Sequence, residues 1–170
     1  MQRWLFLREL DDLADNVPVY YLDESGVDHR LHRPWCRAMR GEVVYTDTPG
    51  SVRGRTSIIS AYKDGRLVQP LLFEGHCDTE VVDTYFETLL LPSIPRWSVI
   101  VLDNARFHCS ASTQALVEKA GCYLMYLPAY SPDLNPIEHV WAALKKALQR
   151  GLQKADDIFL FISDMCQCYC

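Results

Sequence analysis

Ser98-Val-Ile-Val-Leu-Asp103 is an uninterrupted apolar run of strand length that ends in an acidic residue. Val17-Pro-Val-Tyr-Tyr-Leu-Asp23 repeats this pattern near the start of the chain. A continuous apolar run of this kind is typical of a strand that is buried on both faces of a sheet. We therefore predict a central sheet in which two strands each end in an aspartate, Asp23 and Asp103.

Other segments predict the elements around this sheet. Two β-rich runs, 56–62 and 67–73, flank the turn pair Asp64-Gly65 and predict a hairpin. Apolar periodicity predicts several helices, of which the second stops at Pro92, and one further buried strand. The expected helices are 4–13, 78–91, 108–120, 135–150 and 156–165, and the expected strand is 122–127. This order predicts an α/β fold, a mixed central sheet with helices on both faces.

The composition limits the class of protein. The chain has 170 residues, of which 49% are hydrophobic and 23% charged, as expected for one globular domain with a sizeable core. No apolar run approaches the roughly 18 residues that span a bilayer. Seven cysteines are scattered without a paired spacing, which favours free thiols in a reducing compartment. We expect a soluble, cytoplasmic protein with no membrane partner.

The net charge of −5 disfavours a protein that coats nucleic acid through bulk electrostatics. Basic residues are nevertheless clustered, at Arg30, Arg33, Arg37 and Arg40 and again within 145–150. Clusters of this kind can contact phosphates, although a solvated face is the commoner role for a run of charges. The charge pattern therefore leaves local binding to DNA open.

A third acid follows in the segment Tyr130-Ser-Pro-Asp-Leu-Asn-Pro-Ile-Glu138. Asn135 is suited to cap a helix and Pro136 to begin it, which places Glu138 in the first helical turn. An apolar stripe of this helix is expected to face the sheet, with Glu138 at its margin, leaning over the strand ends. The stripe comprises Ile137, Val140, Trp141, Leu144 and Leu148. Three carboxylates can thus converge.

Three carboxylates without a cage of His or Cys suit a hard cation such as Mg²⁺, which prefers oxygen ligands. Two such ions about 4 Å apart would serve an in-line displacement at a phosphodiester. On residues alone, the pattern indicates a metal-dependent, nuclease-like reaction. Each acid also has a structural interpretation, because strand-end aspartates often cap turns and first-turn glutamates complement the helix dipole.

Nearby polar residues are alternative candidates. Asp133 competes for the place of the third ligand, but its Ser-Pro-Asp context favours a turn residue. Glu24 and Asn104 follow the two aspartates, and the strand period turns their side chains to the other face if the strands continue that far. His108 and His139 are candidates to position water or phosphate, although surface or supporting roles are commoner.

Three blocks of the sequence match a known family, in the family's order. They are Tyr21-Leu-Asp-Glu-Ser-Gly26, Leu102-Asp-Asn-Ala-Arg-Phe-His108 and Leu127-Pro-Ala-Tyr-Ser-Pro-Asp-Leu-Asn-Pro-Ile-Glu-His-Val-Trp141. By these blocks the chain, from about residue 17 to residue 150, resembles the mariner-like superfamily of DDE transposases, in particular its bacterial insertion-sequence branch. The 34 residues between Asp103 and Glu138 are the spacing characteristic of that branch.

The resemblance implies an RNase H-like fold and a metal-binding triad of Asp23, Asp103 and Glu138 that holds two Mg²⁺ or Mn²⁺ ions. It implies DNA strand cleavage followed by strand transfer, typically into a TA dinucleotide. Transposon ends and target DNA would be the partners of a homodimer that associates with the nucleoid. The stretch from Gly26 to Arg55 occupies the position of an insertion that reaches a partner subunit or DNA in relatives.

We expect residues 1–170 to form a single DDE catalytic domain, with its core at about 17–150 and a C-terminal helix at about 156–165. Family members carry helix-turn-helix modules before this domain, and the 22 residues before Asp23 show no separate unit of that kind, so we expect the module to be absent. Two alternatives stay open. One is an RNase H-like nuclease acting on other substrates, and the other is a truncated or repurposed transposase fragment that binds DNA or a partner.

Overall fold

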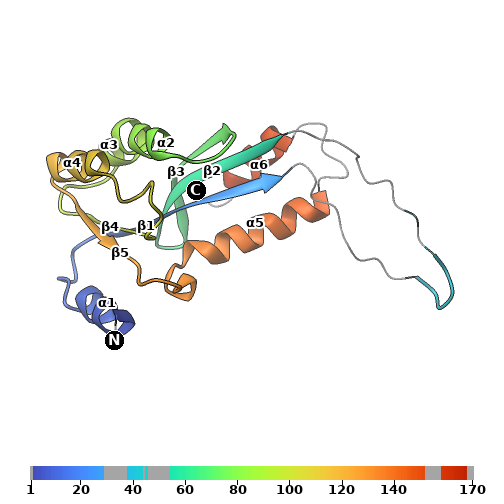
Figure 1. The fold of residues 1–170 in the computed structure, drawn as a ribbon, viewed down its shortest axis with the longest axis horizontal. Helices are drawn as coiled ribbons and strands as arrows, with labels where there is room; N and C mark the ends of the chain where they lie inside the picture. The colour runs from blue at the N-terminus through green and yellow to red at the C-terminus, as the bar shows by residue number, and fades with distance from the viewer. Residues whose placement is uncertain (1, 29–37, 44, 46–53, 152–157, 168–170) are drawn as a thin grey trace.

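The computed structural model describes residues 2–28, 38–43, 45, 54–151 and 158–167 (Figure 1). Its elements include a π-helical segment, η1, and a 3₁₀ helix, η2. In chain order they are α1 (Gln2–Asp11), β1 (Val19–Asp28), β2 (Arg55–Lys63), β3 (Arg66–Glu74), α2 (Thr79–Tyr85), η1 (Phe86–Leu90), α3 (Leu91–Ser93), β4 (Val99–Leu102), α4 (Ala111–Ala120), β5 (Tyr123–Tyr126), η2 (Pro132–Leu134), α5 (Ile137–Gly151) and α6 (Ile158–Gln167).

The five strands form one mixed sheet in the order β3-β2-β1-β4-β5. β2 pairs antiparallel with both β1 and β3, whereas β4 runs parallel to both β1 and β5. The β2–β3 connection is the predicted turn: Asp64 and Gly65 both have positive φ, 50° and 88°, as a tight two-residue hairpin requires. The predicted hairpin and mixed sheet are confirmed.

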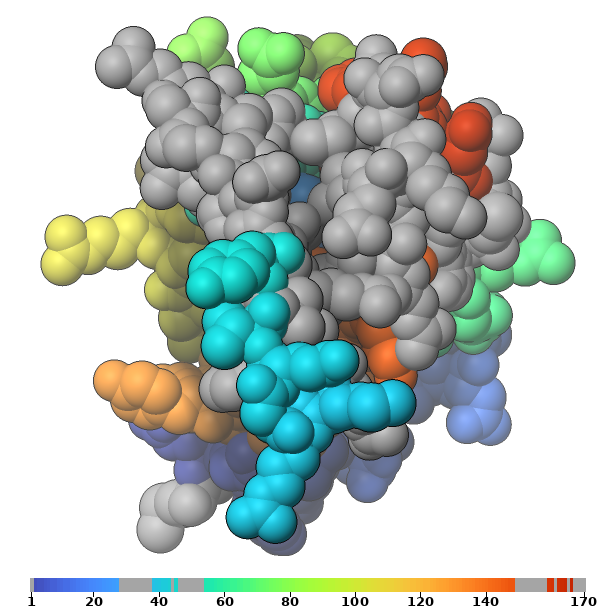
Figure 2. All heavy atoms as spheres, turned by 90° about the vertical axis from the view of Figure 1, so that its right-hand side faces the viewer, coloured from blue at the N-terminus to red at the C-terminus, as the bar shows by residue number. Residues whose placement is uncertain are grey.

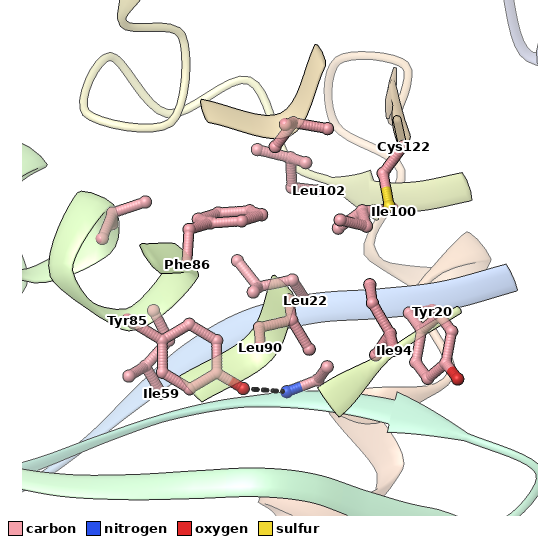
Figure 3. Packing of buried hydrophobic residues seen from close by; sticks show 13 residues of the cluster. Tyr20, Leu22, Ile59, Tyr85, Phe86, Leu90, Ile94, Ile100, Leu102 and Cys122 are labelled. Atoms are coloured by element: carbon pink, nitrogen blue, oxygen red, sulfur yellow. Dashed lines mark hydrogen bonds between the residues drawn. The ribbon is translucent and has the colours of Figure 1, made fainter. Parts of the chain in front are cut away.

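One face of the sheet is covered by α4 and by the continuous helical segment from α2 to α3 (Figures 1 and 3). Tyr85 joins this layer to the sheet: its buried hydroxyl accepts a hydrogen bond from the Ala61 N–H and donates one to the Val68 carbonyl, each at 3.0 Å. The buried residues of this core are Tyr20, Leu22, Ile59, Ala61, Val82, Tyr85, Phe86, Leu90, Ile94, Ile100, Leu102, Val117 and Cys122.

The opposite face is covered by α5 and α6 over one half of the sheet and by α1 over the other. The predicted apolar stripe of α5 is buried there, with no member more than 8% exposed, and it packs against Val27 of β1 and Ile58 of β2. Phe6 of α1 packs against Val99 and Val101 of β4. Helices therefore lie on both faces, as predicted.

Two strands differ from the prediction. β1 continues to Asp28, because its pairing with β2 extends beyond its pairing with β4, so Asp23 is not at the end of its strand. β5 was expected to be buried on both faces, but it is the edge strand of the sheet, and Tyr123 at its start is 54% exposed.

Helix boundaries also differ. α4 begins at Ala111 rather than His108, because the Ser110 hydroxyl caps it by accepting a hydrogen bond from the Thr113 N–H at 3.0 Å. The helical segment after Asp78 passes Pro92, where we predicted it to stop, and ends one residue later at Ser93, after the π-helical turn η1.

The expected cap of α5 is absent as well. The side-chain Oδ1 of Asn135 is buried without a hydrogen-bond partner, so it does not cap the helix; the backbone carbonyl of Asn135 accepts the Glu138 N–H at 3.2 Å instead. α6 begins at Ile158, and the first two residues of the helix predicted at 156–165 lie outside the described residues.

Most of the insertion between Gly26 and Arg55, including three of its four clustered arginines, lies outside the described residues, so the structure does not test its predicted role. Its described part, residues 38–43 and 45, is on the surface in the view of Figure 2 (cyan). Within the described ranges, Cys77, Cys109 and Cys122 carry free thiols, and no helix is long and apolar enough to cross a bilayer.

Candidate active site

The parallel pairing of β1 and β4 brings Asp23 and Asp103 together. Val19 is paired with Val99 and Tyr21 with Val101, an offset of 80 residues (99 − 19) that, continued two residues further, sets Asp23 beside Asp103. The same two-residue step puts both carboxylates on one face, because side chains alternate along a strand. This is the face that carries α5.

Glu138 reaches the same place from the first turn of α5. The three carboxylates line one cavity of about 400 Å³, together with the loop from Leu127 to Asn135, and none of the lining residues is basic. The negative charges of Glu138 and Asp103 both raise the pKa of Asp23. The structure thus brings the three predicted residues to one cavity, while their role as metal ligands stays a prediction.

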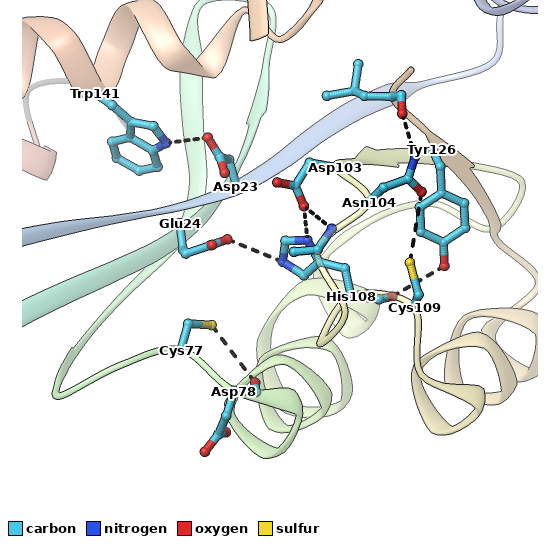
Figure 4. Close-up of polar contacts among 12 residues, drawn as sticks. Asp23, Glu24, Cys77, Asp78, Asp103, Asn104, His108, Cys109, Tyr126 and Trp141 are labelled. Carbon is cyan, nitrogen blue, oxygen red and sulfur yellow. Dashed lines mark hydrogen bonds and ion pairs between the residues drawn. The ribbon is translucent and has the colours of Figure 1, made fainter. Parts of the chain in front are cut away.

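Asp23 is the buried member of the three, only 8% exposed. Trp141, one turn after Glu138 on α5, donates its indole N–H to Asp23 Oδ2 at 3.2 Å (Figure 4). Burial, then the negative charges of Glu24 and Glu138, raise the pKa of Asp23 from 3.8 to about 8. The site therefore holds a carboxylate that lacks a compensating positive charge.

Asp103 is in the opposite situation. Its side chain is 49% exposed, and its Oδ1 atom accepts the Ala105 N–H at 2.9 Å and lies 2.6 Å from His108 Nδ1. The hydrogen bond from His108, followed by that from Ala105, lowers the pKa of Asp103 despite partial burial. Both contacts are made by Oδ1, so Oδ2 of Asp103 takes part in neither.

His108 connects Asp103 to β1 from the other face of the sheet. The imidazole is fully buried, and its Nε2 atom lies 3.3 Å from Oε2 of Glu24, within ion-pair distance (Figure 4). Both of these atoms are buried, and neither makes a hydrogen bond. Burial alone would lower the pKa of His108, but the contacts with Asp103 and Glu24 outweigh it and raise that pKa to about 9. Glu24 does point away from Asp23, as predicted, but it reaches the site through His108.

Of the remaining candidates, Asn104 lines the cavity, because β4 ends at Leu102 and the strand alternation does not extend to it, and its side-chain amide donates to the Leu127 carbonyl at 2.9 Å; Asp133 and His139 lie apart from the cavity. Asp133 belongs to η2, is exposed, and pairs with Arg3 of α1 at 2.9 Å, which lowers the pKa of Asp133. This placement agrees with a structural residue of the turn. His139 is exposed on α5. Sequence reasoning overlooked Trp141 as a polar contact, although its position three residues after Glu138 was a usable signal.

The oxygen-only donor set suits a divalent cation, although among the described residues no three His, Cys, Asp or Glu side chains are arranged so that they could hold a metal ion as they stand. Asp23 and Asp103 each direct one oxygen to a protein donor, and their mutual repulsion is not offset by a basic lining residue. A hard cation would both neutralise this cluster and match its oxygen ligands.

At the level of sequence, the chain matches one family model and two known proteins. A family model described as DDE superfamily endonuclease matches residues 18–159. The Tc1 transposase of Caenorhabditis elegans is 34% identical over 70 residues, which cover 39% of this chain and 26% of the relative. An uncharacterized protein of Sinorhizobium fredii, y4pE/y4sA, is 34% identical over 76 residues, 41% of this chain and 50% of the relative. The chain thus aligns with at most half the length of either relative.

Solved structures show the same fold. A pre-cleavage Mos1 transpososome superposes with a TM-score of 0.78 at 15% identity, over 99% of this chain and 53% of that one. The Mos1 strand transfer complex gives 0.77 at 16% identity, over 99% and 51%. The catalytic domain of Mos1 mariner transposase gives 0.65 at 16% identity, over 98% and 76%. The RNase H-like arrangement of the mixed sheet is confirmed by this likeness.

Proposed function

Because the chain belongs to the DDE superfamily endonuclease family, we propose that it is the catalytic domain of a transposase that cleaves DNA and transfers the cut strand. The observation that carries the proposal is the cavity that Asp23, Asp103 and Glu138 line together and whose lining contains no basic residue. The Tc1 transposase relative and the two Mos1 DNA-transposition complexes support the same reaction. Assignment to the bacterial insertion-sequence branch stays a prediction.

Asp23, Asp103 and Glu138 are the proposed ligands of two Mg²⁺ or Mn²⁺ ions. When bound, the ions would supply the Lewis acidity that activates an attacking oxygen and stabilises a leaving one. The chain's own residues provide the arrangement: the sheet aligns the two aspartates, and α5 adds the glutamate. Trp141 orients Asp23, and burial excludes water from the side of that carboxylate that faces the core.

The proposed partner is DNA, both transposon ends and a target with a TA dinucleotide, bound by a homodimer. The acidic cavity contributes no attraction for phosphate by itself, so bound cations are needed to bring a scissile phosphate to the carboxylates. We treat residues 1–170 as one catalytic domain, since the strands form a single sheet with cores on both faces.

A strand-transfer assay tests this function. Labelled duplexes that end in the element's terminal repeat are incubated with the chain and a supercoiled plasmid, with Mg²⁺, Mn²⁺, Ca²⁺ or EDTA. We expect joined product at TA sites with Mg²⁺ or Mn²⁺, no requirement for Zn²⁺, and no product with Ca²⁺, which does not meet the tight octahedral geometry of Mg²⁺.

Two outcomes would decide against the proposal. Cleavage that persists in excess EDTA would exclude metal-dependent chemistry at this site. Metal-dependent hydrolysis without any joined product, on hybrids or junctions as readily as on transposon ends, would favour the RNase H-like nuclease. The matched control is Asp133→Asn, whose carboxylate is exposed and bound to Arg3 outside the cavity. This variant should yield as much joined product as the parent.

A further inference from the structure

We infer that His108 is a positioning residue that fixes the metal-binding orientation of Asp103 and is itself held by Glu24. The inference rests on the proposed metal site and extends it to two residues on the opposite face of the sheet. Neither of them lines the cavity.

The contact with Asp103 defines which oxygen is available. Oδ1 is held by the His108 ring at 2.6 Å and by the Ala105 N–H at 2.9 Å, so the carboxylate cannot rotate without breaking two contacts. Asp103 needs this restraint more than Asp23 does, because it follows the last residue of β4 and is half exposed. A ligand fixed before the metal arrives loses less conformational freedom on binding.

His108 is itself held in place by its surroundings. Its ring is fully buried and meets Phe107 edge-on, with 4.5 Å between ring centroids. Its backbone N–H donates to the Ala105 carbonyl at 2.9 Å, and its carbonyl accepts the Tyr126 hydroxyl at 3.3 Å. The residue is thus bound to its own loop and to β5.

Glu24 closes the arrangement from β1. It follows Asp23 directly, so the strand alternation sends the two carboxylates to opposite faces of the sheet. Asp23 faces Trp141 on α5, whereas Glu24 faces the second ring nitrogen of His108 (Figure 4). Asp23 and Glu24, neighbours in the middle of β1, therefore contact the two residues that hold the two aspartates, Trp141 and His108.

Two amide substitutions separate the contacts of the imidazole. The amide nitrogen of Asn occupies the place of Nδ1 and that of Gln the place of Nε2, and both are donors. His108→Asn therefore keeps the bond to Asp103 and loses Glu24, whereas His108→Gln keeps Glu24 and loses Asp103. The control is Cys109→Ser, a change at the next, exposed residue of the same loop.

The readout is Mn²⁺ binding without DNA, measured from the free-ion signal in electron paramagnetic resonance, alongside the melting temperature of the metal-free chain. We expect His108→Gln to weaken Mn²⁺ binding by about 10- to 100-fold. His108→Asn should stay within about threefold of the parent and Cys109→Ser should match it. Glu24→Ala, which leaves His108 intact, should weaken binding by about threefold to tenfold and keeps the test valid if His108→Gln does not fold.

A purely structural role gives another pattern: the His108 and Glu24 variants would lower the melting temperature, while the folded protein would bind Mn²⁺ like the parent. Parent-like Mn²⁺ binding by His108→Gln or by Glu24→Ala would overturn the inference. Asp103→Asn tests the underlying proposal separately. If that variant binds Mn²⁺ as the parent does, the metal site itself is wrong, and the inference is lost with it.

Discussion

Asp23 and Asp103 occupy matching positions on adjacent parallel strands, yet their surroundings shift their pKa values in opposite directions. Asp23 is buried beside other acids and receives one neutral donor, the indole of Trp141. Asp103 is half exposed and receives two donors at one oxygen. The comparison shows that equivalent places in a sheet do not make equivalent carboxylates, because the residues that contact them come from different parts of the chain.

Removal of any one of the three carboxylates gives the largest expected effect. Asp23→Asn, Asp103→Asn and Glu138→Gln should each lower divalent-dependent cleavage by about a thousandfold or more, since several kcal/mol of charge stabilisation is lost. Folding should be nearly intact, because the changes remove proposed ligands rather than core packing. Initial rates on a labelled terminal duplex, with melting curves beside them, measure this. Cleavage by Glu138→Gln at the parent rate would remove it from the triad.

The raised pKa of Asp23 should make the stability of the metal-free chain depend on pH. The folded state raises the pKa of Asp23 from 3.8 to about 8, so it favours the protonated acid. The resulting stability is present below pH 4 and is lost as the pH rises towards 8. We expect the melting temperature to fall across this range by on the order of 10 °C.

Asp23→Asn should flatten this decline between pH 4 and 6.5, which thermal melts in EDTA would reveal. Above pH 6.5 a second decline is expected in both proteins, because His108 has its pKa raised to about 9 and its contribution is lost as the pH rises through that value. The same slope in parent and variant below pH 6.5 would contradict the environment assigned to Asp23. Mg²⁺ should restore stability at pH 8 in the parent.

Trp141→Phe should have a moderate effect, because it keeps a buried aromatic ring but removes the N–H donor to Asp23 together with part of the packing volume of the indole. We expect a loss of about 1–3 kcal/mol in the free energy of unfolding at neutral pH, because the buried Asp23 Oδ2 is left without its donor. Urea denaturation measures it. Trp97→Phe, a change at an exposed tryptophan, is the control and should have little effect. Equal losses in the two variants would show that the indole N–H is not what matters.

Arg3→Ala should have the smallest effect. It breaks the exposed ion pair with Asp133, where solvent screens the charges, so the melting temperature should change less than in Trp141→Phe. Cleavage should remain at the parent rate. A strong loss of activity with an unchanged melting temperature would show that η2, whose Pro132 lines the cavity, orients Glu138.

The sequence predicts the parts of the fold that depend on local pattern. The Asp64-Gly65 turn, the stripe of α5 and the two apolar strands are found where expected, because each follows from the spacing of a few neighbouring residues. Strand pairing does not follow from local pattern. β1 continues to Asp28 because it pairs there with β2, which begins more than 25 residues later in the chain.

The same distinction applies to the site. The three carboxylates were found from strand ends and a helix start, but their surroundings were not. The contact of Trp141 with Asp23 spans 118 residues of sequence. Glu24 was predicted to point away from Asp23, and it does, but its meeting with His108 depends on how the loop after β4 folds. Local spacing could have placed Trp141 near the site, but it could not name Asp23 as its partner or predict the contact between Glu24 and His108.

The 80-residue offset between β1 and β4 also says where this chain tolerates insertions and deletions. The connection between the two strands can change length without moving either aspartate, because only the paired residues set their alignment. One residue added or removed within Val99–Leu102 would send Asp103 to the opposite face of the sheet, away from Asp23. Natural or engineered length variants that keep activity should therefore carry their changes outside these four residues.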